Sequence, residues 1–495
     1  MPHYERSAAM DATPKPPTRS PQNQKYRANS FFRPIQTKFS HLPAPKRTHF
    51  RTEIAPRNPS VIANRPAPVP AMLPWSFPTT TLIKAVKGTR DLLPPSTEVW
   101  NRVEAVARSV FRAYNYHEIR TPILEETQLF ARGVGADTDI VTKEMYTFTD
   151  RDESSLTLRP ENTASVIRAY IEHRLDQRPG VQKLYYIGPM FRRERPQKGR
   201  YRQFYQIGAE AIGSDSPLID AEVIEMVVDI LQGVGLSGFE LLINSVGDHN
   251  CRPQYVERLR QELQSVAHTM CGDCQRRADT NPLRVLDCKV EADQPIIGRL
   301  PSILDYLCDE CRAHFDAVKQ YLNDRGIAYQ VNPRMVRGLD YYMRTTFEVV
   351  HGALGAQNSV LGGGRYDGLA ESLGSKVHSP GIGFSIGEDR LVMSVEEQQP
   401  PAALDLFIAP LGDTALRHAA VMAREFRRGG RSVELVEGKL KRAMELANKL
   451  GARYTLIVGD NEMAAGRYAL KDMSTGEQHN LTQEEIAAKL AAAVN

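Results

Sequence analysis

Two strand-like runs enclose a strongly basic turn near the middle of this chain. Apolar and aromatic residues are frequent in residues 183–190 and again in 203–213, while six of the eleven residues from Arg192 to Arg202 are Lys or Arg. Two such runs joined by a short connection predict an antiparallel β-hairpin. A hairpin with this charge suits a site that holds polyphosphate at its base and nucleic acid at its tip.

The returning strand of this hairpin has two different faces, because successive side chains of a strand point in opposite directions. One face is apolar and is expected in the core: Tyr205, Ile207, Ala209 and Ala211. The other carries an aromatic ring, an amide, a glycine and a carboxylate: Phe204, Gln206, Gly208 and Glu210. The glycine would leave room for a small ligand on the sheet. A merely solvated face would instead carry many Lys and Glu.

The incoming strand of the hairpin adds to the polar face. Met190, Arg192 and Glu194 share one side of that strand. Antiparallel pairing can bring this side next to Phe204.

The charge of the chain is divided unevenly. Residues 1–80 hold twelve Lys or Arg against three Asp or Glu, so the formal net charge of +4 leaves −5 for residues 81–495. A nucleic-acid surface must therefore be a local patch. No apolar run approaches the roughly 20 residues of a membrane span, so we expect a soluble protein without a membrane partner.

Residues 1–80 are rich in Pro, Ser, Thr and Arg and show no helical or strand period. This composition predicts a disordered tail. An organelle transit peptide is one alternative, although its amphipathic helix would be broken by the frequent prolines. Another alternative is that translation starts at Met72.

Six cysteines without a secretory signal favour a reducing compartment. Residues 248–326 are charged and helical in pattern, which predicts an inserted domain. It contains Cys271-Gly-Asp-Cys274 and Cys308-Asp-Glu-Cys311, separated by 33 residues. The two pairs could form one tetrahedral zinc site, but the gap exceeds the usual spacing of roughly 15 to 20 residues. Two unrelated pairs of buried thiols are the alternative.

Polar residues cluster where a short strand turns into a helix at residues 156–163. Pro160 ends the strand and leaves Glu161 and Thr163 at the helix start, where they can face a pocket. Alternatively, Asn162 and Thr163 only cap the helix.

An arginine stands in the first turn of another predicted helix, after the strand at 379–387. This place is unfavourable for a cation because of the helix dipole, so Arg390 and the helix end together predict an anion site. Alternatively, Arg390 folds over Glu388 or Asp389.

Three consecutive glycines, residues 362–364, lack the Lys-Ser/Thr and the following helix of a phosphate loop. We expect them to let a ligand approach the backbone. After a linker at 398–403, short strands alternate with helices, which predicts a small α/β binding module at 404–495.

The hairpin, Arg337-Gly-Leu-Asp-Tyr-Tyr342 and Gly362-Gly-Gly-Arg-Tyr-Asp-Gly368 occur in this order. Together they resemble the bacterial-type histidyl-tRNA synthetases, a class II aminoacyl-tRNA synthetase family, from about Leu82 to the C-terminus. The resemblance implies an α+β fold with an antiparallel sheet flanked by helices. It places the catalytic domain at 81–247 and 327–397, a helical insertion at 248–326 and an anticodon-binding domain at 404–495.

The resemblance also implies a reaction. L-Histidine would be activated with ATP and Mg²⁺ to histidyl-adenylate and transferred to the 3′ end of tRNA-His by a cytoplasmic homodimer. One alternative is a synthetase-like regulatory subunit of histidine biosynthesis, although such relatives generally lack the last domain and the arginine motifs. A non-catalytic RNA-binding protein on the same fold is another.

Roles follow for the positions that match the family. The implied catalytic residues are Arg337 and Arg192, and no side chain is assigned to a metal. The implied ATP-binding residues are Arg192, Glu194, Arg200, Phe204 and Arg390. The implied histidine-binding residues are Glu161, Thr163, Gln206, Glu210, Arg337, Tyr342 and Tyr366. Gln197 would meet the tRNA acceptor end, and Asn162 departs from the family by standing where a glycine is expected.

Overall fold

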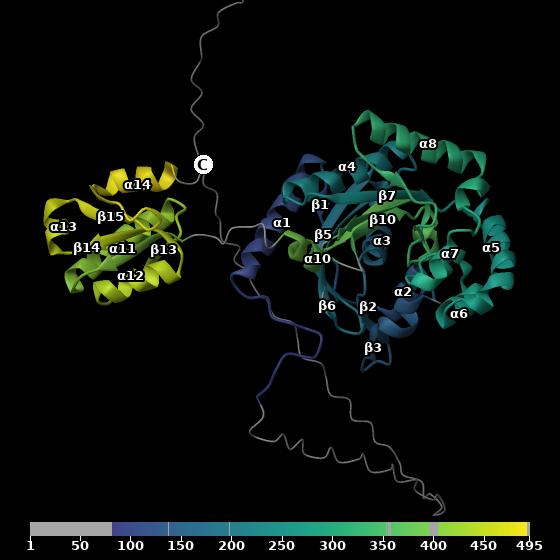
Figure 1. The fold of residues 1–495 in the computed structure, drawn as a ribbon, viewed down its shortest axis with the longest axis horizontal. Helices are drawn as coiled ribbons and strands as arrows, with labels where there is room; N and C mark the ends of the chain where they lie inside the picture. The colour runs from purple at the N-terminus through teal and green to yellow at the C-terminus, as the bar shows by residue number, and fades with distance from the viewer. Residues whose placement is uncertain are drawn as a thin grey trace, which may run out of the picture. The chain divides into compact units, whose positions relative to one another are not determined.

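The computed structural model describes residues 82–136, 138–197, 199–352, 354, 358–395 and 404–492. The predicted tail at 1–80 and the predicted linker at 398–403 lie outside these residues. Within them, the strands form sheets of eight, five and three strands (Figure 1). None of the described helices combines the length and the apolar character that crossing a membrane requires.

The eight-stranded sheet has the order β1-β5-β6-β11-β10-β9-β7-β8. Its strands are β1 (His117–Glu118), β5 (Gln182–Phe191), β6 (Gln203–Ile212), β7 (Phe239–Ser245), β8 (Gln330–Val331), β9 (Met343–His351), β10 (Ser359–Arg365) and β11 (Gly381–Gly387). All neighbours are antiparallel except the edge pairs β1–β5 and β7–β8. The predicted hairpin is confirmed as β5–β6, and Met190 stands opposite Phe204 in its register.

Helices cover both faces of this sheet. The first core joins Ile207 and Ala209 to four helices, α1 (Ser96–Ala113), α4 (Pro217–Gly233), α8 (Asp309–Asp324) and α10 (Glu388–Val395). On the other face, Met190 and Ile212 pack with α3 (Thr163–Glu172) and α9 (Leu369–Ser372). The prediction that the apolar face of the returning strand lies in a core is thus confirmed. Of the opposite face, Ile212 lies in the second core and Phe204 packs against it.

A buried ion network ties α4 to its neighbours. The carboxylate of Asp220 in α4 accepts hydrogen bonds from Arg365 of β10 at 2.5 Å and lies 2.8 Å from Nε2 of His314 in α8. Arg365 is fully buried and also pairs with Asp367 at 2.7 Å. The arginine of the glycine-rich motif therefore stabilises the fold.

The predicted insertion contains α5 (Arg252–Val266), α6 (Gly272–Thr280) and α7 (Gln294–Ile297), which are labelled in Figure 1. It also contains short 3-10 turns at Ala267–Thr269, Pro282–Val285, Glu291–Asp293 and Ile303–Tyr306. These elements share a core of their own, and all six cysteines lie in it or against it. Helix α8 closes the segment but buries Phe315, Val318 and Leu322 in the first core of the large sheet.

The cysteines form two separate groups. Cys271 and Cys274 lie with Cys288 and Asp293, whereas Cys308 and Cys311 lie with Asp248 and Cys251. The hypothesis of one zinc site built from both Cys-x-x-Cys pairs is therefore wrong.

A smaller sheet leads into the start of α3. It has the order β2-β4-β3, with β2 (Leu124–Glu126), β3 (Tyr146–Thr149) and β4 (Ser155–Leu158), and it is accompanied by α2 (Thr127–Val134) and a π-helix at Ile140–Glu144. Strand β4 ends at Leu158, two residues before Pro160, in agreement with the predicted end of the strand.

Residues 404–492 form the five-stranded sheet, of order β13-β12-β14-β15-β16. Its elements are β12 (Leu404–Pro410), α11 (Asp413–Arg428), β13 (Val433–Leu435), α12 (Leu440–Lys449), β14 (Ala452–Val458), α13 (Asp460–Ala465), β15 (Tyr468–Asp472), β16 (Gln478–Leu481) and α14 (Gln483–Ala492). Helices α11 and α14 share one core with this sheet, and α12 shares another. The predicted strands and helices are present, and the hairpin β15–β16 with α13 and α14 comes in addition.

Candidate active site

A cavity of about 960 Å³ lies over the base of the β5–β6 hairpin. Its walls come from the hairpin, the start of α3, strands β9 to β11, the loop before β9 and the predicted insertion. It brings together most of the predicted site residues: Glu161, Thr163, Arg192, Glu194, Arg200, Phe204, Gln206, Arg337, Tyr342 and Arg390. Glu210, Tyr366 and Gln197 do not line it.

Guanidinium groups gather at the hairpin end of the cavity. Arg192 donates from Nε to the carbonyl oxygen of Pro160 at 2.9 Å, and its guanidinium lies 5.2 Å from the ring centre of Phe204. Arg200 pairs with Glu194 at 2.8 Å. Arginines clustered on a cavity wall bind phosphate oxygens through charge-assisted hydrogen bonds.

Arg390 joins this cluster from the first turn of α10. Its Nη1 donates to the carbonyl oxygen of Ser359 at 2.7 Å, and its Nε donates to that of Gly199 in the hairpin. Burial lowers the pKa of Arg390, and the neighbouring Arg200 lowers it further. Asp389 instead pairs with Arg90 at 2.7 Å, so the alternative in which Arg390 folds over its neighbours is wrong.

The start of α3 is capped by Glu161. Its carboxylate accepts from the backbone N–H groups of Thr163 at 2.8 Å and Ala164 at 3.0 Å. Burial raises the pKa of Glu161 in spite of these hydrogen bonds. Asn162 makes no side-chain cap and accepts from the hydroxyl of Thr121 at 2.6 Å, so the alternative of capping by Asn162 and Thr163 is wrong.

Glu210 lies fully buried behind the cavity wall. It accepts hydrogen bonds from the hydroxyls of Thr163 at 2.7 Å and Tyr366 at 2.5 Å. Burial raises the pKa of Glu210 to about 8. A carboxyl of this kind is largely neutral at pH 7, and a cationic or N–H-donating ligand would favour its ionised form.

Glycines make room for the side chains of this site. A Cβ on Gly208 would lie 2.4 Å from the hydroxyl oxygen of Tyr186, and a Cβ on Gly383 would lie 1.7 Å from a carboxylate oxygen of Glu210. The space above Gly208, which we expected to hold a ligand, is therefore filled by Tyr186.

The triple glycine serves Arg337 in the same way. A Cβ on Gly362 would lie 1.7 Å from Nη2 of Arg337. These glycines lie inside β10, and the space of a side chain at Gly362 is taken by Arg337. Gly362 also lines the cavity, so the approach of a ligand to its backbone stays a prediction.

Arg337 is held by a residue that the sequence did not reveal. Its Nη1 lies 3.1 Å from a carboxylate oxygen of Glu348, and its guanidinium carbon lies 6.0 Å from the ring centre of Tyr342. Glu348, Tyr341 and Tyr186 line the cavity as well. The sequence does carry a signal for Glu348, because it is the one acidic residue in the β-branched and aromatic run 345–350.

Gln197 lies at the tip of the hairpin, where its backbone pairs with Arg200. It lines a separate hollow of about 340 Å³ with basic neighbours that include Lys143, Arg193 and Arg195. Such a basic hollow suits a phosphate backbone.

The predicted insertion supplies one wall of the cavity through Arg284, Asp287 and Lys289. Arg334, on the loop before β9, lines it too and donates to the carbonyl oxygen of Pro301 at 2.6 Å. The sequence had shown no site residue in the insertion, because these charges do not stand out in a charged helical segment.

Two family models match the chain. One is described as "Histidyl-tRNA synthetase" and matches residues 88–391, and the other is described as "Anticodon binding domain" and matches residues 405–493. The chain is 84% identical over 414 residues to the histidine–tRNA ligase of Solibacter usitatus, covering 84% of this chain and 100% of the relative. It is 60% identical over 422 residues to that of Koribacter versatilis, covering 82% and 95%.

Solved structures give a matching result. Apo histidyl-tRNA synthetase of S. aureus has a TM-score of 0.67 at 40% identity and covers 83% of this chain and 100% of that one. A Bacillus halodurans structure titled "ATP phosphoribosyltransferase regulatory subunit/histidyl-tRNA synthetase" has a TM-score of 0.56 at 21% identity, covering 75% and 97%. At that identity the second likeness shows the fold alone.

Proposed function

The chain belongs to the histidyl-tRNA synthetase family, and from that premise we propose how its residues carry out the reaction. It is a histidine–tRNA ligase, which uses ATP to couple histidine to tRNA. The 84% identity to a histidine–tRNA ligase supports this activity over that of a regulatory subunit.

One observation carries the assignment of roles: the arginines of the hairpin and Arg337 face the same cavity as the polar start of α3. Arg192 contacts the α-phosphate of ATP and Arg390 the γ-phosphate, while Arg200 contacts the polyphosphate between them. Glu194 and Phe204 hold the adenine, which would stack on the Phe204 ring.

The amino acid occupies the other end of the cavity. Its ammonium group donates to Glu161, Thr163 and Gln206. In support of this, Oε1 of Gln206 is buried and has no hydrogen-bond partner among the residues that the structure describes. Glu210 and Tyr342, with Tyr366 behind them, select the imidazole, which offers one N–H donor and one acceptor.

The chemical step needs no covalent nucleophile. The histidine carboxylate attacks the α-phosphorus, the bond to the bridging oxygen breaks, and pyrophosphate leaves with the electron pair. Arg337 and Arg192 stabilise the negative charge that develops around the α-phosphate, and the cavity aligns the reactants. A 3′-terminal hydroxyl of tRNA-His then attacks the acyl carbon and releases AMP.

Mg²⁺ would neutralise phosphate charge in this cavity. Glu194 and Glu348 are carboxylates on its wall, which suits a cation that prefers oxygen ligands. Both carboxylates are paired with arginines, so the phosphates of ATP would supply most of the ligands of Mg²⁺.

The remaining parts fit the binding of tRNA. Gln197 and the hairpin tip meet the acceptor end, residues 248–326 contact the acceptor stem, and residues 404–495 read the anticodon. The catalytic domain comprises 81–247 and 327–397 and works as a homodimer in the cytoplasm. Sedimentation of the purified protein would test the dimer.

Histidine-dependent exchange between ATP and pyrophosphate tests the proposal. We expect exchange with histidine and none with other amino acids, and charging of tRNA-His in the presence of the tRNA. Absence of exchange with retained tRNA binding would instead indicate a non-catalytic RNA-binding protein.

A further inference from the structure

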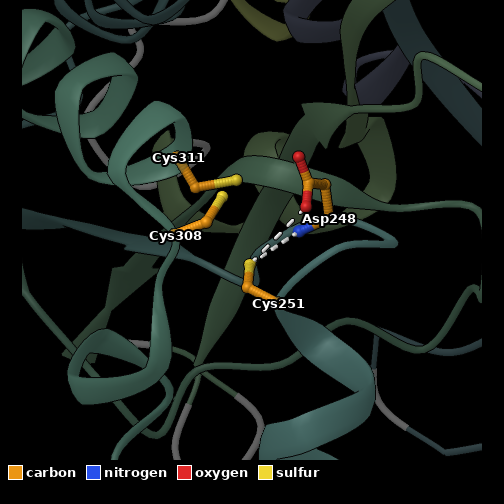
Figure 2. A group of neighbouring side chains, drawn as sticks. All are labelled: Asp248, Cys251, Cys308 and Cys311. Carbon is orange, nitrogen blue, oxygen red and sulfur yellow. Dashed lines mark hydrogen bonds between the residues drawn. The ribbon is translucent and has the colours of Figure 1, made fainter.

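Four side chains converge from the two ends of the predicted insertion: Asp248, Cys251, Cys308 and Cys311 (Figure 2). One ligand atom of each lies within 4.8 Å of the ligand atoms of the other three. Cys251 directly precedes α5 and Cys308 directly precedes α8. Each end of the insertion thus contributes a pair of ligands that are three positions apart.

One distance within this group equals that expected between two ligands of a tetrahedral zinc ion. With Zn–S of about 2.3 Å and Zn–O of about 2.1 Å, a sulfur and an oxygen ligand lie about 3.6 Å apart. Sγ of Cys251 lies 3.6 Å from Oδ1 of Asp248. The backbone N–H of Asp248 also donates to that sulfur at 3.3 Å, which favours a thiolate.

The carboxylate of this group is buried without full compensation. Asp248 is 2% exposed, and within the described residues its Oδ2 has no hydrogen-bond partner. Arg344 approaches that oxygen only to 3.6 Å. A buried carboxylate oxygen in this state is costly, and a cation held between it and the sulfurs would remove the cost.

We propose that Asp248, Cys251, Cys308 and Cys311 bind a structural Zn²⁺ that fastens both ends of the insertion to the large sheet. Three thiolates and a carboxylate form a closed set of four ligands, as in structural rather than catalytic zinc sites. Three thiolates and a carboxylate carry more negative charge than Zn²⁺ neutralises. The guanidinium of Arg344, 3.6 Å from Oδ2 of Asp248, would offset part of this excess.

The site is connected to the loop before β9. Arg252, the residue after Cys251, donates to the carbonyl oxygens of Val246 at 2.9 Å, Gly247 at 3.0 Å and Tyr342 at 2.5 Å. The metal would therefore also position the backbone of Tyr342, a step that rests on the role proposed above for that residue.

The other cysteine group differs and is not part of the proposal. The backbone N–H of Cys271 lies 3.2 Å from both carboxylate oxygens of Asp293, and the thiol of Cys288 donates to the same carboxylate at 3.3 Å. That carboxylate is fully partnered by the protein.

Zinc content tests the proposal without reference to activity. The full chain, purified without added metal and then offered a molar excess of Zn²⁺, is passed through gel filtration and analysed by mass spectrometry for metal per chain. We expect Cys251→Ser and Cys311→Ser to hold one equivalent less than the unaltered protein. Asp248→Cys, which keeps four ligands, should hold as much as the unaltered protein.

The outcomes separate this inference from the proposed reaction. Equal zinc in the unaltered protein and in Cys311→Ser would overturn the site. If the cysteine variants do not fold, an unaltered protein without zinc overturns it. If the unaltered protein does hold zinc, its cobalt-substituted form is compared with that of Asp248→Cys. Stronger thiolate-to-metal absorption in Asp248→Cys, from a fourth thiolate ligand, supports the site, and identical spectra overturn it. If the unaltered protein holds zinc but shows no histidine-dependent exchange, the proposed reaction is contradicted and the proposed metal site is not.

Discussion

Arg337 is the residue whose removal separates chemistry from binding. Nη1 of Arg337 lies 3.1 Å from a carboxylate oxygen of Glu348 on the cavity wall. Nε of Arg337 has no hydrogen-bond partner in the described part of the chain. Arg337→Ala should lower ATP–pyrophosphate exchange about 10²- to 10³-fold, because it removes a charge aimed at the reacting phosphate. Binding of tRNA, measured on the same preparation, should stay within about twofold, well under 1.4 kcal/mol.

Arg325→Ala is a matched control for that substitution. Arg325 pairs with Glu225 at 2.9 Å and does not line the cavity, so both measurements should remain at the level of the unaltered protein. An equal loss of exchange and tRNA binding in Arg337→Ala would point to a role in folding.

The buried carboxyl of Glu388 should make the free energy of unfolding depend on pH. It is fully buried, and burial raises its pKa to about 9, with further contributions from Glu104 and Asp389. Unfolded glutamate has a pKa of about 4.3, so between these values the native state holds the extra proton and loses stability as the pH rises. Glu388→Gln cannot ionise. Its Tm relative to the unaltered protein should therefore rise between pH 5 and pH 9.

Thermal unfolding across that range measures the effect, with the exposed Glu437→Gln as the control. A Tm difference for Glu388→Gln that stays constant from pH 5 to pH 9 would contradict the buried, protonated state of Glu388.

Strand β10 acts on the site through a residue that has no side chain. Because a Cβ on Gly362 would lie 1.7 Å from Nη2 of Arg337, Gly362→Ala should displace that guanidinium. We expect a fall in exchange of roughly 10²-fold, similar to removal of a stabilising donor. Gly368→Ala is the matched control, since its Cβ would meet only Met343 at 3.6 Å. Equal activity of both variants would rule out this steric role.

The sequence predicted those elements whose signal is local. Alternation along residues 203–213 separated the two faces of β6, and Pro160 marked the start of α3. The sequence does not predict the hairpin β15–β16, because β16 is largely exposed and polar and shows no alternation of apolar and polar residues. The charge of residues 309–324 predicts a helix of the insertion, but Phe315, Val318 and Leu322 of α8 lie in the core of the large sheet.

Within the site, sequence reasoning found most of the polar residues and missed what surrounds them. Tyr186 above Gly208 and Arg337 beside Gly362 are pairs formed by tertiary packing, which a linear pattern cannot show. The burial of Glu210 behind the cavity wall has the same origin, because α3 and Tyr366 come from distant parts of the chain.

The five-stranded sheet at 404–492 has cores that share no residue with those of the large sheet. A chain ending at Val395 should therefore retain histidine-dependent exchange within a few-fold. Its charging efficiency, kcat/KM for tRNA-His, should fall at least about tenfold, or about 1.4 kcal/mol, because the proposed anticodon contacts are lost. Loss of exchange in this truncated chain would mean that the last domain also supports activation.

The order of the large sheet has a consequence for synthesis on the ribosome. Strands β9, β10 and β11 are the last of its strands in the chain, yet they lie between β6 and β7 in the sheet. The inner edge of β7 is unpaired until β9 has emerged at about residue 351, and the inner edge of β6 is unpaired until β11 has emerged at about residue 387. An unpaired edge of this kind is open to association with other chains. A nascent chain stalled inside β10 should therefore depend on chaperones, and a stop codon there should yield aggregates rather than a smaller folded protein.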